Sequence, residues 1–220
     1  MITRVISGGQ TGVDQAALRV AASLGIATGG WCPPGRASED GVIPADFPLI
    51  ATPDDRSAAA PDIPRSQRTE WNVRDSDGTL VLCLGSLDDA GPGTRFTAAC
   101  AARYGKPLFV ADPADLADAR RVREWVDAHA IQTLNVAGPS EQALPGIADL
   151  TKTFLRDVLA RWSAISTLQI LANFALKRPR SRIFPPFSGL WMGPIRPYIG
   201  IGPLPADRPD RPTEGKFKPK

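Results

Sequence analysis

The first 162 residues alternate short apolar runs with the apolar spacing of helices. Residues 4–7 read as a buried strand and residues 8–12 as a turn. Apolar residues at positions 13, 16, 17, 20, 21 and 24 then share one face of a helix. Gly25 follows, where a helix commonly ends in a left-handed residue. The pattern predicts a strand, a turn and a helix over residues 4–24.

The same alternation continues along the chain. We predict further strands at 26–31, 48–52, 78–85, 107–111 and 133–137, and further helices at 67–74, 94–104, 114–129 and 145–162. The run between Gly78 and Gly85 is apolar, which suits a strand covered on both faces. The order predicts an α/β fold: a Rossmann-like, doubly wound, mostly parallel sheet with helices on both faces. In such a sheet the loops that follow the strands meet at one edge.

Residues 163–220 break this pattern. They contain 10 prolines, and proline lacks a backbone donor and restricts the residue before it. We expect a ligand-binding domain at 1–162, then a helical extension to about Leu176 and an irregular, disordered, proline-rich tail.

Charge also separates the two parts. Residues 163–220 hold 10 Lys and Arg against 3 Asp and Glu, which leaves 16 basic and 20 acidic residues in 1–162. The acidic balance of the domain argues against a nucleic-acid-binding face. No secretory pattern opens the chain, the one long apolar stretch (163–176) is too short for a membrane span, and the three cysteines lack metal-site spacing. We therefore expect a cytoplasmic protein with no membrane or nucleic-acid partner.

Glycine-rich segments supply the candidate chemistry. In the first glycine loop (residues 8–12), glycines would let the backbone approach a ligand, and the following helix would add free N–H groups and partial positive charge. The alternative is a tight turn in which Thr11 or Asp14 only caps the helix. The candidate phosphate-binding residues are Gly8, Gly9, Gln10, Thr11, Gly12 and Asp14.

The second glycine loop (residues 29–36) adds Gly30, Trp31 and Arg36. Arg36 could neutralise a phosphate and Trp31 could stack on a ring, or Trp31 could simply pack beneath the loop. The polar segment 67–77 and two later strand ends complete the candidates: Arg68, Glu70, Arg74, Gly93, Thr94, Asn135 and Gly138. We assign no catalytic or metal-binding residue, because the single histidine, His129, has no plausible catalytic partners.

These motifs together resemble the family named "putative molybdenum carrier", which consists of circularly permuted relatives of the LOG and lysine-decarboxylase-like proteins in the Rossmann-type SLOG superfamily. The resemblance covers about residues 2–162. It rests on segments 7–14, 29–36, 39–41, 68–77, 93–94 and 135–141. It implies a homo-oligomer that binds molybdenum cofactor, a phosphorylated pterin, as a carrier and not as an enzyme. Gly91-Pro92-Gly93-Thr94 departs from the Gly-Gly-Thr expected of the family.

The same resemblance bears on two alternatives, a nucleotide-binding sensor and a LOG-like nucleotide phosphoribohydrolase. LOG-type hydrolases carry Gly-Thr-x-x-Glu, and that glutamate takes part in catalysis. The matching run here begins at Gly93 and places Thr97 at the acid position, which disfavours hydrolysis by that route. A nucleotide and a pterin phosphate both offer an anion and a flat ring, so the sequence suits either.

Overall fold

A computed structural model describes residues 1–163 of the 220-residue chain. Five parallel strands form the central sheet in the order β2-β1-β9-β7-β8. They are β1 (Arg4–Ile6), β2 (Ala27–Gly29), β7 (Gly78–Leu82), β8 (Leu108–Ala111) and β9 (Thr133–Ala137).

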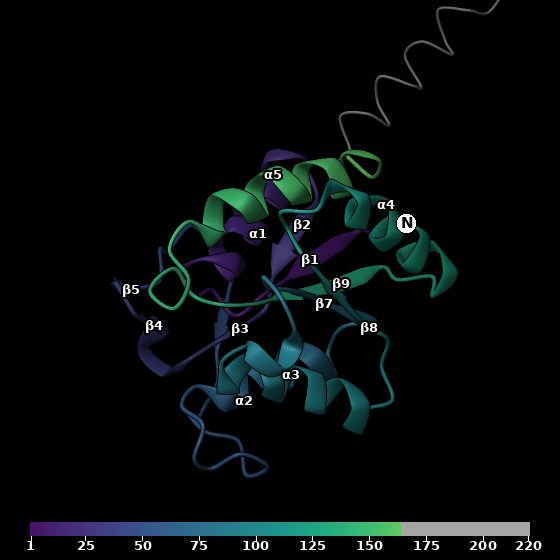
Figure 1. Cartoon of the computed structure of the whole chain (residues 1–220). Helices are drawn as coiled ribbons and strands as arrows, with labels where there is room; N and C mark the ends of the chain where they lie inside the picture. Colours follow the sequence, from purple (N-terminus) through teal and green to yellow (C-terminus); the bar gives the residue numbers. More distant parts are fainter. Residues whose placement is uncertain (164–220) are drawn as a thin grey trace, which may run out of the picture. The chain divides into compact units, whose positions relative to one another are not determined.

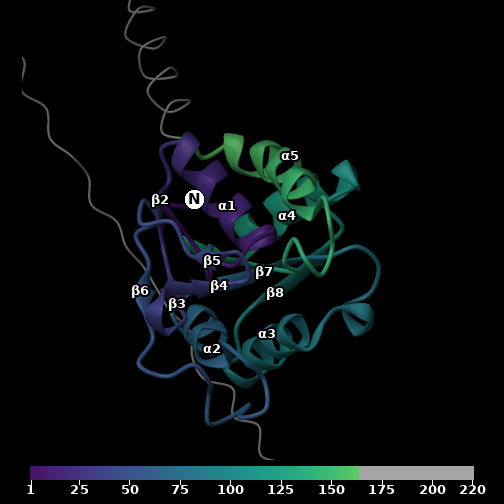
Figure 2. The ribbon, with the colours of Figure 1, turned by 90° about the vertical axis from the view of Figure 1, so that its left-hand side faces the viewer.

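Five α-helices cover the two faces of this sheet. They are α1 (Val13–Ser23), α2 (Ser66–Arg74), α3 (Pro92–Arg103), α4 (Leu116–Ala128) and α5 (Ile147–Ala160). Helices α1, α4 and α5 lie on one face, and α2 and α3 lie on the other (Figure 1, and from the side in Figure 2). The predicted Rossmann-like, doubly wound fold is confirmed.

The apolar patterns explain these positions. The whole of β7 is buried, as expected for a strand with neighbours and helices on both sides. On α5, Ile147, Phe154, Leu155 and Val158 are fully buried and join the main hydrophobic core. Gly25 has a φ of 71°, the left-handed conformation predicted after the first helix.

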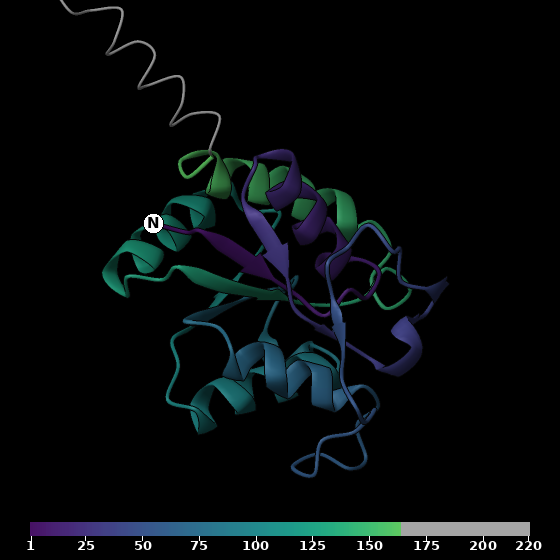
Figure 3. The ribbon, with the colours of Figure 1, turned by 180° about the vertical axis from the view of Figure 1, so that it is seen from behind.

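The apolar run at 26–31 does not form the single strand that we predicted. Strand β2 ends at Gly29, and β3 (Trp31–Cys32) leaves the sheet to pair in parallel with β6 (Ile50–Ala51). The chain turns at Gly30, which has a φ of 129°. A Cβ there would lie 2.3 Å from the carbonyl oxygen of Ser7, so the turn against β1 requires glycine. Figure 3 shows this side of the sheet from behind.

Several short elements had no sequence signal. A hairpin joins β4 (Ala37–Ser38) to β5 (Gly41–Val42), and 3-10 turns lie at η1 (Pro34–Arg36) and η2 (Leu87–Asp89). The predicted helical extension and proline-rich tail lie outside the described residues. Within residues 1–163, no helix has the length and apolar character needed to cross a membrane.

Candidate ligand-binding site

The loops that follow β1, β7 and β9 enclose a pocket of about 330 Å³. Helix α1 leaves β1 on one face of the sheet, whereas α3 leaves β7 on the other, so the pocket lies where the winding of the sheet reverses. The start of α2 closes another side. The wall of the pocket includes Gln10 and Asp14, Arg65 and Arg68, residues 91–94 and Thr97, and residues 137–140.

The first glycine loop shapes this pocket by its close contacts. Gly9 and Gly12 have φ values of 75° and 74°. A Cβ on Gly12 would lie 2.6 Å from the carbonyl oxygen of Pro139, and one on Gly8 would lie 1.8 Å from Nη1 of Arg68. These glycines therefore let the loop after β9 and the Arg68 guanidinium approach the backbone.

Asp14 and Arg68 form a buried ion pair at the pocket. The Oδ2 atom of Asp14 lies 2.8 Å from Nη1 of Arg68 and also accepts a hydrogen bond from the Gln10 backbone N–H at 3.2 Å. Asp14 is only 2% exposed. This burial raises the pKa of Asp14, and the positive charge of Arg68 opposes the rise.

Two buried donors at the pocket lack acceptors. Nε of Arg68 and Nε2 of Gln10 have no hydrogen-bond partner among the residues that the structure describes. A buried donor without an acceptor costs about 1–3 kcal/mol. The pocket therefore favours a ligand that supplies oxygen acceptors.

The start of α3 also lies at the pocket wall. Gly91 precedes the helix without a side-chain cap, and Pro92 occupies the first helical position, where proline is well tolerated. Pro92 departs from the expected family pattern, but α3 still begins regularly at this residue. A Cβ on Gly91 or Gly93 would meet no atom within 4 Å. The backbone N–H groups of Thr94 and Arg95 donate to the Gly91 carbonyl oxygen at 3.0 and 3.1 Å, which leaves the N–H of Gly93 and the helix dipole to act on a ligand.

Glu39, on the turn between β4 and β5, connects three loops. Its carboxylate accepts hydrogen bonds from Oγ1 of Thr11 at 3.0 Å and Oγ of Ser140 at 2.7 Å. Its backbone N–H donates to Oε1 of Gln10 at 3.0 Å. Glu39, Arg65, Thr97 and Ser140 line the pocket but were not among the predicted site residues, although Glu39, Thr97 and Ser140 lie in or near the segments that carry the family resemblance.

Comparison with known proteins agrees with this architecture. Residues 5–159 match the family described as the circularly permutated YpsA SLOG family. The chain belongs to this family. It is also similar to a crystal structure of a protein from Syntrophus aciditrophicus SB named "Putative molybdenum carrier protein". The two share 40% sequence identity with a TM-score of 0.65, over 72% of this chain and 96% of that one. No match was found among curated proteins.

The pocket of this SLOG protein contains Gln10, Asp14, Arg68, Gly93, Thr94 and Gly138 from the predicted site residues. A Cβ on Gly138 would lie 2.3 Å from the carbonyl oxygen of Leu82, so this glycine allows the loop after β9 to pass close to β7. Gly8, Gly9, Thr11 and Gly12 do not line the pocket. Gly8 lies against Arg68, Gly12 lies against Pro139 and Thr11 donates to Glu39, and these three partners line the pocket. The other six predicted residues, Gly30, Trp31, Arg36, Glu70, Arg74 and Asn135, do not line it.

Arg36 is engaged by its own loop. Its guanidinium donates four hydrogen bonds of 2.8–3.3 Å to backbone carbonyl oxygens of residues 43, 44, 47 and 49. These contacts hold the segment between β5 and β6. The side chain that we expected to neutralise a phosphate is thus directed to the protein backbone.

Trp31 and Arg74 belong to an aromatic cluster on the α2 side. Nε1 of Trp31 donates to Asp75 at 2.7 Å, and its ring meets Trp71 edge to face at 4.7 Å. The guanidinium of Arg74 lies 4.6 Å from the Trp71 ring centroid and also pairs with Asp75. Trp31 therefore packs against the scaffold, which is the alternative that the sequence left open.

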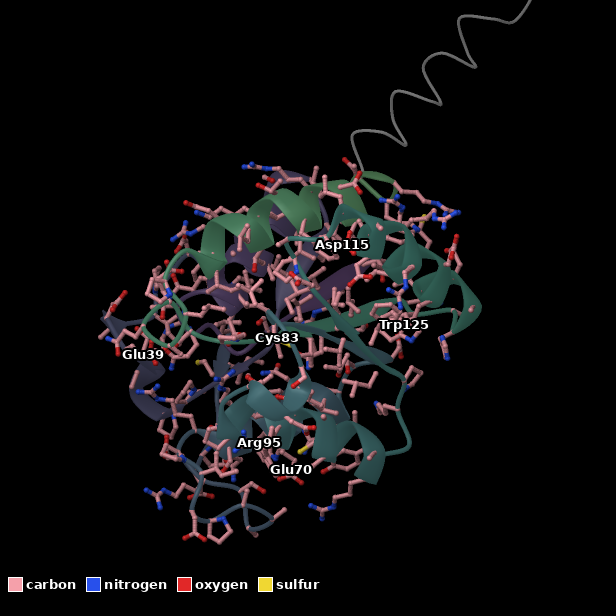
Figure 4. All side chains as sticks on the ribbon, viewed as in Figure 1. Glu39, Glu70, Cys83, Arg95, Asp115 and Trp125 are labelled. Atoms are coloured by element: carbon pink, nitrogen blue, oxygen red, sulfur yellow. The ribbon has the colours of Figure 1, made fainter. Side chains whose placement is uncertain are left out.

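Glu70 and Asn135 are likewise occupied within the scaffold. Glu70 accepts hydrogen bonds from Ser57 and, at 2.7 Å, from the Tyr104 hydroxyl, and it pairs with Arg103 at 3.2 Å. Asn135 is buried in β9 and donates to Thr79 on β7 at 3.2 Å. Figure 4 shows Glu70 near α2 and α3, well apart from Glu39.

Proposed function

We propose that this SLOG protein binds molybdenum cofactor, a phosphorylated pterin, in the pocket at the ends of β1, β7 and β9, and acts as its carrier. The observation that carries the proposal is the combination, in one pocket, of an uncapped helix start and the unpaired Nε of Arg68. Both features favour an anion. The name of the relative from Syntrophus aciditrophicus supports molybdenum cofactor as the cargo.

The phosphate would bind at the first turn of α3. The backbone N–H of Gly93 would donate to one of its oxygens, and Arg68 would approach from α2. Arg65 also lines the pocket, and its guanidinium makes no hydrogen bond or ion pair within residues 1–163. It can therefore contribute a second positive charge.

The carboxylates of the pocket favour binding over hydrolysis. Of the residues described at its wall, only Asp14 and Glu39 are acidic. Asp14 is paired with Arg68, and Glu39 accepts two hydroxyl hydrogen bonds. Thr97, at the position of the LOG glutamate, donates its hydroxyl to the carbonyl oxygen of Gly93 at 3.0 Å. Neither acid is placed as an unengaged general acid, so we propose a carrier that does not turn its ligand over.

We further propose that the protein works in the cytoplasm. Cys32, Cys83 and Cys100 are free and buried, which accords with a reducing compartment.

The proposal is tested by titrating the protein with the fluorescent phosphorylated pterin that forms when molybdenum cofactor is oxidised, before and after phosphatase treatment. Loss of the phosphate should weaken binding by about tenfold or more, because charge-assisted hydrogen bonds contribute about 1.5–3 kcal/mol. Gly93→Asp should weaken binding of the phosphorylated form by placing a carboxylate at the helix start, and Gly93→Ala is the matched control. No binding at micromolar concentrations, or equal affinity for both forms, would reject the proposal. Tighter binding of nucleotides than of the pterin would favour a nucleotide sensor.

A further inference from the structure

A fixed pair of acceptors faces one side of the pocket. The two carboxylate oxygens of Glu39 each accept one hydroxyl hydrogen bond, from Thr11 and from Ser140. A carboxylate oxygen has two acceptor positions, so each oxygen keeps one for a ligand. Because the two hydroxyls come from the loops after β1 and β9, they also hold the carboxylate in a defined orientation.

An unused donor lies beside this acceptor pair. Oε1 of Gln10 accepts the Glu39 backbone N–H, which fixes the orientation of the Gln10 amide and makes Nε2 its free donor. Gln10 lines the pocket and is only 6% exposed, and Nε2 has no partner among the described residues. Two acceptor positions and one donor thus belong to two pocket-lining residues that are hydrogen-bonded to each other.

This set matches one kind of heterocycle. A 2-amino-4-oxopyrimidine ring, present in both pterin and guanine, presents an amine N–H, a ring N–H and a carbonyl oxygen in a row. We propose that Glu39 and Gln10 select this ring: Glu39 accepts the two N–H groups, and Nε2 of Gln10 donates to the carbonyl oxygen. Adenine places a ring-nitrogen acceptor where Glu39 needs a donor, and hypoxanthine lacks the amine.

The ring-binding pair is joined directly to the phosphate-binding groups. The Gln10 backbone N–H donates to Asp14 at 3.2 Å, and Asp14 pairs with Arg68 at 2.8 Å. One pocket of about 330 Å³ therefore holds both sets of groups. The inference rests on the proposed function for the anion end, but it concerns a different part of the ligand.

The test measures dissociation constants for GMP, IMP, AMP, the phosphorylated pterin and ribose 5-phosphate by calorimetry. We expect GMP to bind at least about tenfold more tightly than AMP, with IMP between them, because a hydrogen bond to a charged carboxylate is stronger than one between neutral groups. Whichever of GMP and the pterin binds more tightly identifies the source of the ring. This series needs no variant, so it stands even if a substitution at Glu39 impairs folding.

Variants then assign the selection to Glu39. Glu39→Gln should remove the preference for GMP over AMP and leave ribose 5-phosphate affinity within about twofold of the wild-type value. Asp40→Asn is the matched control, because Asp40 is exposed and outside the pocket lining. Equal affinity for GMP and AMP, or an unchanged preference in Glu39→Gln, would overturn this inference while leaving phosphate binding intact. If none of the phosphorylated compounds binds, the proposed function fails as well.

Discussion

The two glycine loops of this protein look alike in sequence and differ in what they contact. Both follow neighbouring strands of the central sheet, β1 and β2. The first loop, residues 8–12, carries Gln10 to the pocket wall and lets Arg68 lie against Gly8. The second loop, residues 29–36, turns away from the sheet at Gly30 and ends in Arg36, which binds four backbone carbonyls.

The difference shows that glycine indicates a close approach but does not say what approaches. At the second loop the approaching group is the protein's own backbone, because the Arg36 guanidinium donates its described hydrogen bonds to carbonyl oxygens of residues 43–49. At the first loop two buried donors, on Gln10 and Arg68, are left without acceptors. An unpaired buried donor distinguishes the loop that we propose to bind a ligand from the structural one, because a folded protein rarely leaves such groups unpaired without a reason.

The largest effect should come from the structural loop. Arg36→Met leaves four carbonyl oxygens without their donor, and we expect the free energy of unfolding to fall by about 3 kcal/mol. Urea unfolding measures this loss. Ligand affinity of the folded fraction should not change, and a selective loss of affinity at full stability would place Arg36 in the site after all.

Arg68→Met should weaken ligand binding, which Arg36→Met should not. It removes the unpaired Nε and the guanidinium from the pocket, so binding of the phosphorylated pterin should weaken by about 30-fold, or about 2 kcal/mol. Fluorescence titration gives the affinity, and Arg36→Met is the comparison. The variant would also leave Asp14 without its partner, so unfolding is measured in parallel. Unchanged affinity would show that Arg68 serves the scaffold only.

Asp14 and Glu70 should respond to pH with opposite signs. Burial raises the pKa of Asp14, so its contribution to stability is present at low pH and is lost as pH rises through that raised value. Burial would also raise the pKa of Glu70, but hydrogen bonds from Ser57 and Tyr104 and the charge of Arg103 lower it overall. The contribution of Glu70 is therefore present above the usual glutamate pKa and is lost as pH falls through the lowered value.

Urea unfolding of Asp14→Asn and Glu70→Gln between pH 3 and 8 tests these signs. As pH rises, the free energy of unfolding of Asp14→Asn should increase relative to that of the wild type. Over the same pH change, the free energy of unfolding of Glu70→Gln should decrease relative to that of the wild type. If the stability difference from the wild type changed with pH in the same direction for both variants, the raised pKa of Asp14 or the lowered pKa of Glu70 would be wrong.

The smallest effect is expected at the start of α3. Gly93→Ala adds a Cβ that meets no atom within 4 Å, and alanine favours the helix, so the free energy of unfolding should stay within about 0.5 kcal/mol of the wild type. A loss above about 1 kcal/mol in thermal or urea unfolding would show that this surface is packed and not open to a ligand.

Much of the fold follows from local patterns. The apolar run at 78–82 and the helical spacing of α1 and α5 are long enough to determine strand and helix. The loops after β1, β7 and β9 meet because parallel strands end at one edge, which made the pocket predictable.

What the sequence could not predict depends on contacts between distant residues. Strands β3 to β6 have only two residues each, too few for a period to be recognised. The position of Glu39 depends on partners 28 and 101 residues away in the chain. Arg36 and Trp31 have residue types that suit a ligand, but non-local contacts with backbone carbonyls and with Asp75 engage them.

The most direct test of the central claim is to identify the ligand that the protein retains. The full chain and its Gly93→Asp variant would be purified natively without oxygen and denatured, and the released material oxidised and analysed by fluorescence and mass spectrometry. We predict a phosphorylated pterin near one molecule per chain from the wild type and a marked loss from the variant. A nucleotide in its place, or equal pterin from both proteins, would contradict the account.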